Sequence, residues 1–502
     1  MILLSFSVTF MQVVRFPVSF SSDALVEYQT AIHQSASWNP ANTLFQGDAF
    51  DVYLSVTILP QMISQTLGVP LFVVFDVVLM GVVALMPFLF YVTISKYFGN
   101  GKITCLAIAL VPQFLFYQDY TQTFRASLAL VFLFLLLYSL RVPGTRGSIL
   151  TLLFGAGLAF SYFVVAYFGL ALCILFYLYP YIVKPFRWKQ QRIVTGYRVL
   201  LIGVEVALWA FFVGLTEVGW ELGQLLALLA SWMSGVSSLS VFSSYPSGSA
   251  LGSVVTAWLD LEFVLIGVGA LLAIYYVIRH DRDDMGLSGP WVLAGTLGLA
   301  AILATVYVPG VGALLGLARL LIYSIPFLMI FLAFSLLQVN EHAKFVFVAF
   351  ILLMLPMNLF LPAYQLEPMT YPTSSLPATR ILANANRPLT EAQVVGALFI
   401  AREANLVQTD VGVDSIAGAS LLFAGSINWL TSVNIVTVPD GKLDTQVKYF
   451  AFSNVLLDSG LFSTTVSSAG SVSIFTARIN TTVLSDNLSI VYNDGSIYFG
   501  FR

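Results

Sequence analysis

Residues 70–95 read PLFVVFDVVLMGVVALMPFLFYVTIS, a run in which Asp76 is the only charged side chain. About 20 apolar residues are enough to cross the hydrocarbon core of a membrane, so this run predicts a transmembrane helix. The whole chain has the same character, since its 502 residues are 58% hydrophobic and only 9% charged. A soluble globule of this size cannot bury so much apolar surface, and we therefore expect a polytopic membrane protein.

Apolar stretches of similar length recur up to residue 362. They lie at about 70–95, 103–118, 125–140, 149–160, 162–183, 197–217, 258–278, 290–307, 314–337 and 345–362. The segment 149–183 is too long for one helix, and the cations at its two ends, Arg146 and Lys184, should share a side of the membrane. We therefore predict a helical hairpin there and ten crossings in all. Met1–Val14 is apolar but too short to span, and a complete first helix in its place would give eleven.

The distribution of Lys and Arg predicts the orientation. Most cationic residues before position 362 fall in the loops 96–102, 141–148, 184–198, 279–289 and 338–344. The alternate loops, with residues 1–69, hold only Arg15, Arg125 and Arg319. By the positive-inside rule the first set is cytoplasmic. Residues 15–69, 119–124 and 218–257, and everything after 362, are then expected outside the cell membrane.

The composition changes after Pro362. Residues 1–362 form the expected transmembrane domain, and residues 363–502 hold ten of the 25 acids and seven of the 22 basic residues, as a soluble extracytoplasmic domain would. We predict a helix at 390–404 capped by Thr390, and a hairpin turn at Asn493–Ser496 before a last strand. Further strand-like runs lie at 406–409, 419–424, 433–438, 447–452, 472–477 and 488–492. This pattern favours a small α/β or α+β domain, and the sequons at Asn480 and Asn487 agree with an outside location.

Composition also excludes several functions. The net charge of -3 is too small to indicate a nucleic-acid partner. The two cysteines, Cys105 and Cys173, lie in apolar runs, so the sequence predicts neither a disulfide framework nor a cysteine metal site.

Two carboxylates stand out in the first outer loop, at Asp23 and Glu27. A helix that begins near Ser22 would place both on one face, close to its positive end. Such a pair could bind a divalent cation on a diphosphate, or one acid could deprotonate an acceptor hydroxyl. A solvated acidic turn is the competing interpretation, because this spacing is common.

Three side chains at the outer boundaries are candidates for binding an anionic substrate: Arg125, Arg319 and Tyr323. A guanidinium just inside an apolar span needs an anionic partner or a wet cavity, and a lipid phosphate suits its geometry. Pairing with an acid, such as Asp76 for Arg319, explains either arginine equally well.

Several short motifs resemble archaeal polytopic membrane proteins of unknown function that are related to the GT-C superfamily of lipid-linked-sugar glycosyltransferases. In the first outer loop they are Ser22–Tyr28, Trp38–Pro40 and Leu54–Pro60. The later matches are Arg125, Ser161-Tyr162-Phe163 with Tyr167, Arg319 with Pro326, and Ile490–Tyr498. The chain departs from these proteins at Ser161-Tyr162-Phe163, where they have Ser-His-Tyr, and at Arg125-Ala126, where they have Arg-Gln.

The resemblance implies a GT-C-like fold and roles for the acids. It makes Asp23 the catalytic base or a metal ligand, Glu27 its helper, and Asp119 the assisting acid of the second outer loop. A cofactor, if there is one, would be Mg or Mn held by Asp23 and Asp119.

The expected function is therefore transfer of a sugar from a polyprenyl-phosphate donor to a glycan, lipid or protein acceptor at the outer membrane face. A catalytically inactive scaffold that displays the C-terminal domain is the alternative, because it fits the two departures. A transporter is a third possibility, although the sequence shows no clear inverted repeat.

Overall fold

The computed structural model describes residues 23–33, 53–98, 124–184, 193–212 and 391–404, eight strands after residue 410, and the isolated positions 271, 291, 294–295, 298, 326–327 and 424. Within this part, two helices are long and apolar enough to span a membrane, Leu71–Tyr97 and Phe163–Ile182. The predicted spans at 103–118, 258–278, 290–307, 314–337 and 345–362 lie outside the described residues, apart from those few positions.

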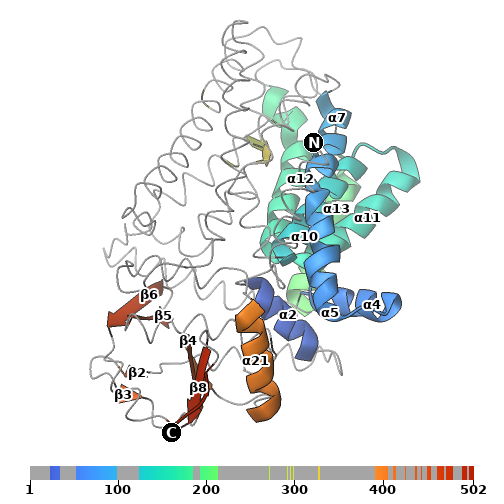
Figure 1. Ribbon diagram of the computed structural model, residues 1–502. Helices are drawn as coiled ribbons and strands as arrows, with labels where there is room; N and C mark the ends of the chain where they lie inside the picture. Colours follow the sequence, from blue (N-terminus) through green and yellow to red (C-terminus); the bar gives the residue numbers. More distant parts are fainter. Residues whose placement is uncertain are drawn as a thin grey trace, which may run out of the picture.

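The first span is one rod made of four consecutive pieces (Figure 1). These are α5 (Leu71–Val73), the π-helix η1 (Val74–Leu79), α6 (Met80–Ala84) and α7 (Met86–Phe98). The shorter α4 (Ile58–Leu67) precedes it. A π turn takes an extra residue into one helical turn and is frequent at functional sites. Here it contains Asp76, which is buried.

The predicted division of residues 149–183 is confirmed. Helix α11 (Gly144–Ser161) ends at Tyr162, whose extended backbone (φ -163°, ψ 119°) separates it from α12 (Phe163–Val183). A helix lies where the span at 125–140 is predicted, α10 (Phe124–Ser139), and another, α13 (Gly196–Phe212), begins where a span is expected from 197. The break is needed because an unbroken helix would carry residue 183 far beyond a bilayer.

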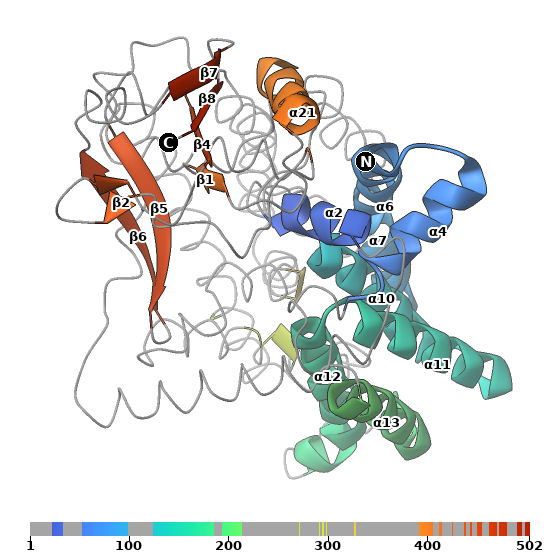
Figure 2. The same ribbon diagram turned by 90° about the horizontal axis from the view of Figure 1, so that it is seen from below.

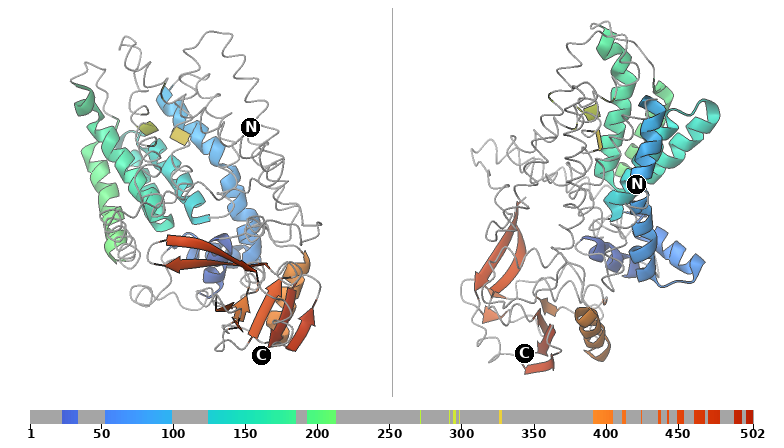
Figure 3. Two further views of the ribbon diagram at one scale, coloured as in Figure 1. Left: turned by 90° about the vertical axis from the view of Figure 1, so that its left-hand side faces the viewer. Right: turned by 45° about the horizontal axis from the view of Figure 1, so that its top comes forward.

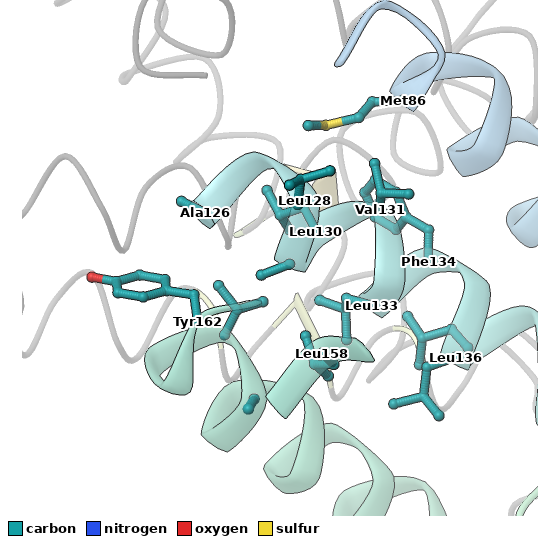
Figure 4. Packing of buried hydrophobic residues seen from close by; sticks show 14 of the residues in the cluster. Met86, Ala126, Leu128, Leu130, Val131, Leu133, Phe134, Leu136, Leu158 and Tyr162 are labelled. Atoms are coloured by element: carbon teal, nitrogen blue, oxygen red, sulfur yellow. The ribbon is translucent and has the colours of Figure 1, made fainter. Parts of the chain in front are cut away.

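Helix α10 is the centre of the helical bundle. It packs against α7, α11 and α12, and nearly all of its side chains are buried (Figure 4). Lipid tails are as apolar as leucine, so close packing and polar contacts must hold membrane helices together. Two such contacts join α7 to α10: the Thr93 hydroxyl donates to the Phe134 carbonyl at 2.9 Å, and the Tyr97 hydroxyl donates to the Leu137 carbonyl at 2.6 Å.

Small residues let α11 and α13 approach closely. A Cβ added at Gly147 would meet the Arg198 guanidinium at 2.6 Å, and one added at Gly155 would strike the Glu205 carboxylate. Thr151, between these glycines, is buried too. Spacing of small residues by four is typical of tightly packed membrane helices.

The two ends of α10 differ in their surroundings. At its N-terminal end lies α2 (Asp23–His33), which crosses the end of the bundle (Figures 1 and 2). At its C-terminal end the guanidinium of Arg141 lies over the Tyr97 ring and the Lys96 ammonium over the Tyr138 ring. The segment expected outside, α2, thus lies at one end of α10, and the residues expected in the cytoplasm lie at the other. The side of the membrane on which each end lies remains a prediction.

The described part of the C-terminal region contains one helix and three small sheets (Figure 3). The helix is α21 (Glu391–Ala404), where one is predicted at 390–404. The strands are β1 (Val411–Val413), β2 (Val436–Thr437), β3 (Lys442–Leu443), β4 (Tyr449–Ser453), β5 (Leu461–Ser468), β6 (Ser471–Arg478), β7 (Ser489–Asn493) and β8 (Ile497–Phe501).

The largest sheet has the order β1-β4-β8-β7, with β1 parallel to β4 and the other pairs antiparallel. Strands β7 and β8, which flank the turn predicted at Asn493–Ser496, pair in antiparallel fashion as expected. Strands β5 and β6 form a separate hairpin. The runs predicted at 406–409 and 419–424 lie outside the described residues except for position 424.

Candidate functional site at the N-terminus of helix α10

Helix α2 presents an apolar stripe to the bundle. Ala24, Tyr28 and Ala31 recur at helical spacing and are buried, and Leu25 is buried beside them. Glu27 lies on the same side, between Ala24 and Ala31, and is completely buried. A charge in such a position is costly unless it is paired and hydrogen-bonded.

Arg125, in the first turn of α10, supplies that pairing. Its Nη1 lies 3.1 Å from Glu27 Oε1, and both side chains are buried. Two backbone groups add to the ion pair: the Phe124 N–H donates to Glu27 Oε2 at 3.0 Å and the Arg125 N–H donates to Oε1 at 3.5 Å. Glu27 therefore caps α10 from 97 residues away, and its negative charge meets the positive end of the helix dipole.

Aromatic rings enclose the arginine. The guanidinium carbon of Arg125 lies 5.4 Å from the centre of the Tyr53 ring and 5.3 Å from that of Tyr162. The two ring centres are themselves 5.6 Å apart, so the three groups form a nearly equilateral triangle. Cation–π contacts of this kind strengthen when the cation is removed from water, as it is here.

A second row of rings holds the acid in place. Phe75 of η1 makes edge contacts with Tyr28 and with Phe124, at centre separations of 5.4 Å and 5.5 Å. Burial raises the pKa of Tyr28 to about 12. Helix α2, the first span and α10 thus meet around one ion pair.

This geometry defines what Glu27 and Arg125 can do. The carboxylate of Glu27 accepts hydrogen bonds from two backbone N–H groups and one guanidinium, so both of its oxygens are engaged in holding α2 on α10. The charge of Arg125 is compensated by this carboxylate. The arrangement is that of a positioning pair that anchors α2 on α10.

The predicted site residues fall into two groups. Glu27 and Arg125, predicted separately, lie in contact with each other. Asp23 is the first residue of α2, one helical turn before Glu27, and its side chain is not among those the structure describes. Asp119, Arg319 and Tyr323 lie outside the described residues. Their catalytic, substrate-binding and metal-binding roles remain predictions.

A metal site was expected at Asp23 and Asp119. Among the residues that the structure describes, no group of three or more His, Cys, Asp and Glu side chains is placed to hold a metal ion. The residues that would complete a metal site with Asp23 are therefore not identified among the described residues.

Arg198 is a buried residue, although the sequence indicates only that it belongs to a cationic loop. Its guanidinium donates to the carbonyls of Leu140 at 3.1 Å, Val142 at 2.9 Å and Gly144 at 3.2 Å, and to that of Ser139 at 3.3 Å. These carbonyls lie at the C-terminus of α10 and in the turn that follows, where a cation matches the helix dipole. An arginine at the boundary of an apolar span is the only sequence signal for this role.

Glu205 of α13 is the other notable acid. Both of its carboxylate oxygens are shielded from solvent, and no hydrogen-bond partner for them lies within the described part of the chain. They lie against Gly155 of α11. The hydrogen bonding that usually accounts for an acid within a span is not observed here.

Comparison with known proteins yields structural neighbours. No model of a protein family matches the chain, and no curated protein gives a significant match. The chain is similar to two crystal structures of the Archaeoglobus fulgidus oligosaccharyltransferase. The first, in complex with Zn and sulfate, is 13% identical with a TM-score of 0.49, and the match covers 94% of this chain and 72% of that one.

The second structure is tethered through a disulfide bond to an acceptor peptide that contains the NVT sequon. It is 13% identical with a TM-score of 0.48, and the match covers 96% of this chain and 73% of that one. Both neighbours are thus structures of one archaeal oligosaccharyltransferase. At these TM-scores the likeness assigns no role to any residue.

Proposed function

We propose that the chain transfers a sugar from a polyprenyl-phosphate donor to an acceptor at the outer face of the cell membrane. The observation that carries the proposal is the ion pair between Glu27 and Arg125, at 3.1 Å. It fixes the helix of the first outer loop on the N-terminus of α10, and Asp23 lies one turn away on that helix. The backbone of Asp23, the acid of the GT-C-like motif, is thereby held near the end of the helical bundle.

In the proposed reaction, Asp23 acts as general base. Its carboxylate takes the proton of the acceptor hydroxyl or amide while the acceptor atom bonds to the anomeric carbon. The bond between that carbon and the phosphate oxygen breaks, and polyprenyl phosphate leaves with the electron pair. Arg319, with Tyr323 nearby in sequence, would hold the phosphate, and Asp119 would assist from the second outer loop.

The described residues contribute by positioning. The Glu27–Arg125 pair and the rings of Tyr53 and Tyr162 fix the end of α10 against α2, so that Asp23 starts from a defined backbone position. Preorganisation of this kind lowers the cost of aligning a base with its substrate. The C-terminal domain, proposed as an extracytoplasmic α/β or α+β unit of residues 363–502, would help to bind the acceptor.

The test is a transfer assay with purified protein and a panel of polyprenyl-phosphate sugars. We expect the wild-type chain to transfer sugar and Asp23→Asn to lose at least about 100-fold of the rate, as loss of a general base does. Asp48→Asn is the matched control, since it removes an acid from the same loop and should leave the rate unchanged. Equal rates in wild type and Asp23→Asn would contradict the proposed role.

One observation favours the scaffold alternative. Tyr162 stands where the similar archaeal proteins have His, and its ring packs on the buried guanidinium of Arg125. A His at this position could take part in catalysis in those proteins, whereas Tyr162 packs against Arg125 in this chain. A wild-type chain that transfers none of the sugars in the panel, while remaining folded, would support this alternative.

A further inference from the structure

Helix α4 exposes large apolar side chains at its surface. Its inward side carries Gln61, whose side-chain amide donates to the Ala31 carbonyl of α2. Its outward side carries Leu59, Met62 and Leu67, which are 36%, 59% and 61% exposed. A surface helix in water places its apolar side chains toward the core, so the exposed side of α4 calls for an apolar environment.

The connection to the first span fixes where α4 lies. Gly68, with φ of +66°, ends the helix in the left-handed conformation, and the N–H groups of Gly68 and Val69 both donate to the Ser64 carbonyl. The spanning rod starts at Leu71. This turn sends α4 sideways from the end of the rod, at the same end of the bundle as α2 (Figures 1 and 3).

The exposed apolar surface of α4 continues onto the span. Phe72 and Val77 of the rod are 38% and 41% exposed, as expected for side chains that face lipid. Residues 53–75 contain no Asp, Glu, Lys or Arg. A helix with exposed apolar side chains that is joined to a lipid-facing surface, and that runs crosswise to it at the end of the span, has the apolar side of an interfacial helix.

We propose that α4 lies in the membrane–water interface at the α2 end of the bundle, with Leu59, Met62 and Leu67 among the lipid acyl chains. The partner of this surface is the bilayer itself. Because Gln61 of α4 contacts α2, the membrane surface then also sets how far α2, the helix that begins with Asp23, lies from the bilayer. The proposal depends on membrane insertion and is independent of any sugar transfer.

Site-directed spin labelling tests this placement. Single cysteines replace Met62, Leu67 or Arg146 in a Cys105→Ser/Cys173→Ala background, and the labelled proteins are reconstituted in phosphatidylcholine vesicles. Arg146 is the control, because it is an exposed cation in the first turn of α11 and so reports access from water. We expect the ratio of collisions with oxygen, which enters lipid, to collisions with a water-soluble nickel complex to be several-fold higher at Met62 and Leu67 than at Arg146.

Two results would overturn the proposal. Equal nickel access at all three sites would place α4 in water, and protection of Met62 and Leu67 from both reagents would place a protein surface over them. Two reporter positions are used so that a folding defect in one variant leaves the other informative. A label at Phe88, 40% exposed in the middle of the span, gives the ratio expected in lipid.

Discussion

Breaking the ion pair between Glu27 and Arg125 should destabilise the protein strongly. At a separation of 3.1 Å the attraction is about 5 kcal/mol with an effective dielectric constant of about 20. Glu27→Gln keeps the shape of the side chain but removes its charge, and the guanidinium of Arg125 stays buried between aromatic rings. Removing one partner of a buried pair costs about 3–5 kcal/mol, and we expect Glu27→Gln to fall in this range.

A double-mutant cycle separates the pair from other contacts. Arg125→Met should cost less than Glu27→Gln, about 2–3 kcal/mol, because the backbone N–H groups of Phe124 and residue 125 still bind the carboxylate. The double variant has no buried charge left. Its cost should therefore be at least about 2 kcal/mol below the sum of the two single costs.

The cycle is measured by denaturant titration in detergent micelles, with the free energy of unfolding as the readout. Arg146→Met is the control, since Arg146 is exposed and its loss should change the free energy by less than about 0.5 kcal/mol. Single costs that add to within about 0.5 kcal/mol would mean that Glu27 and Arg125 act independently, and would refute the description of them as a clamp.

Two further predictions concern Tyr28 and Gly155. Because burial raises the pKa of Tyr28 from 10.0 to about 12, the unfolded chain loses this proton first, and stability should fall as the pH rises from about 10 to about 12. An alkaline titration followed by near-ultraviolet circular dichroism should show a shallower loss for Tyr28→Phe, and an identical profile would contradict the assignment. Gly155→Ala places a methyl group against the Glu205 carboxylate and should cost about 1–3 kcal/mol. In a Glu205→Ala background the thermal destabilisation by Gly155→Ala should shrink to less than half, and an undiminished effect would show that the carboxylate is not the obstacle.

Local signals were sufficient for most of the elements that the structure describes. The break at Tyr162 follows from the length of the apolar run and the charges at its two ends, and the pairing of β7 with β8 follows from the turn signal Asn493-Asp494-Gly495-Ser496. Pattern alone did not predict η1, because an apolar run with one acid reads as an ordinary helix. The strands β1, β3 and β5 were also missed, since strand propensity depends on neighbours that a sequence does not reveal.

The candidate site was only partly predictable for a similar reason. The predicted topology puts Glu27 and Arg125 on the same side of the membrane, and the sequence allows either an acid or an anionic substrate as the partner of the arginine. Which acid it is depends on a contact between residues 98 positions apart. The capping of α10 by Glu27, and its enclosure by Tyr53 and Tyr162, are tertiary facts that neither local composition nor spacing encodes.

The length of α10 has a consequence for access to this region. Its 16 residues span about 24 Å, less than the roughly 30 Å of a hydrocarbon core. Both ends carry buried charge, Glu27 with Arg125 at one and Arg198 at the other. If α10 is centred in the bilayer, each charged end sits about 3 Å below the level of the lipid headgroups. A lipid-borne substrate would then reach the Arg125 end by sliding sideways within the leaflet, whereas a soluble acceptor would have to descend from the water.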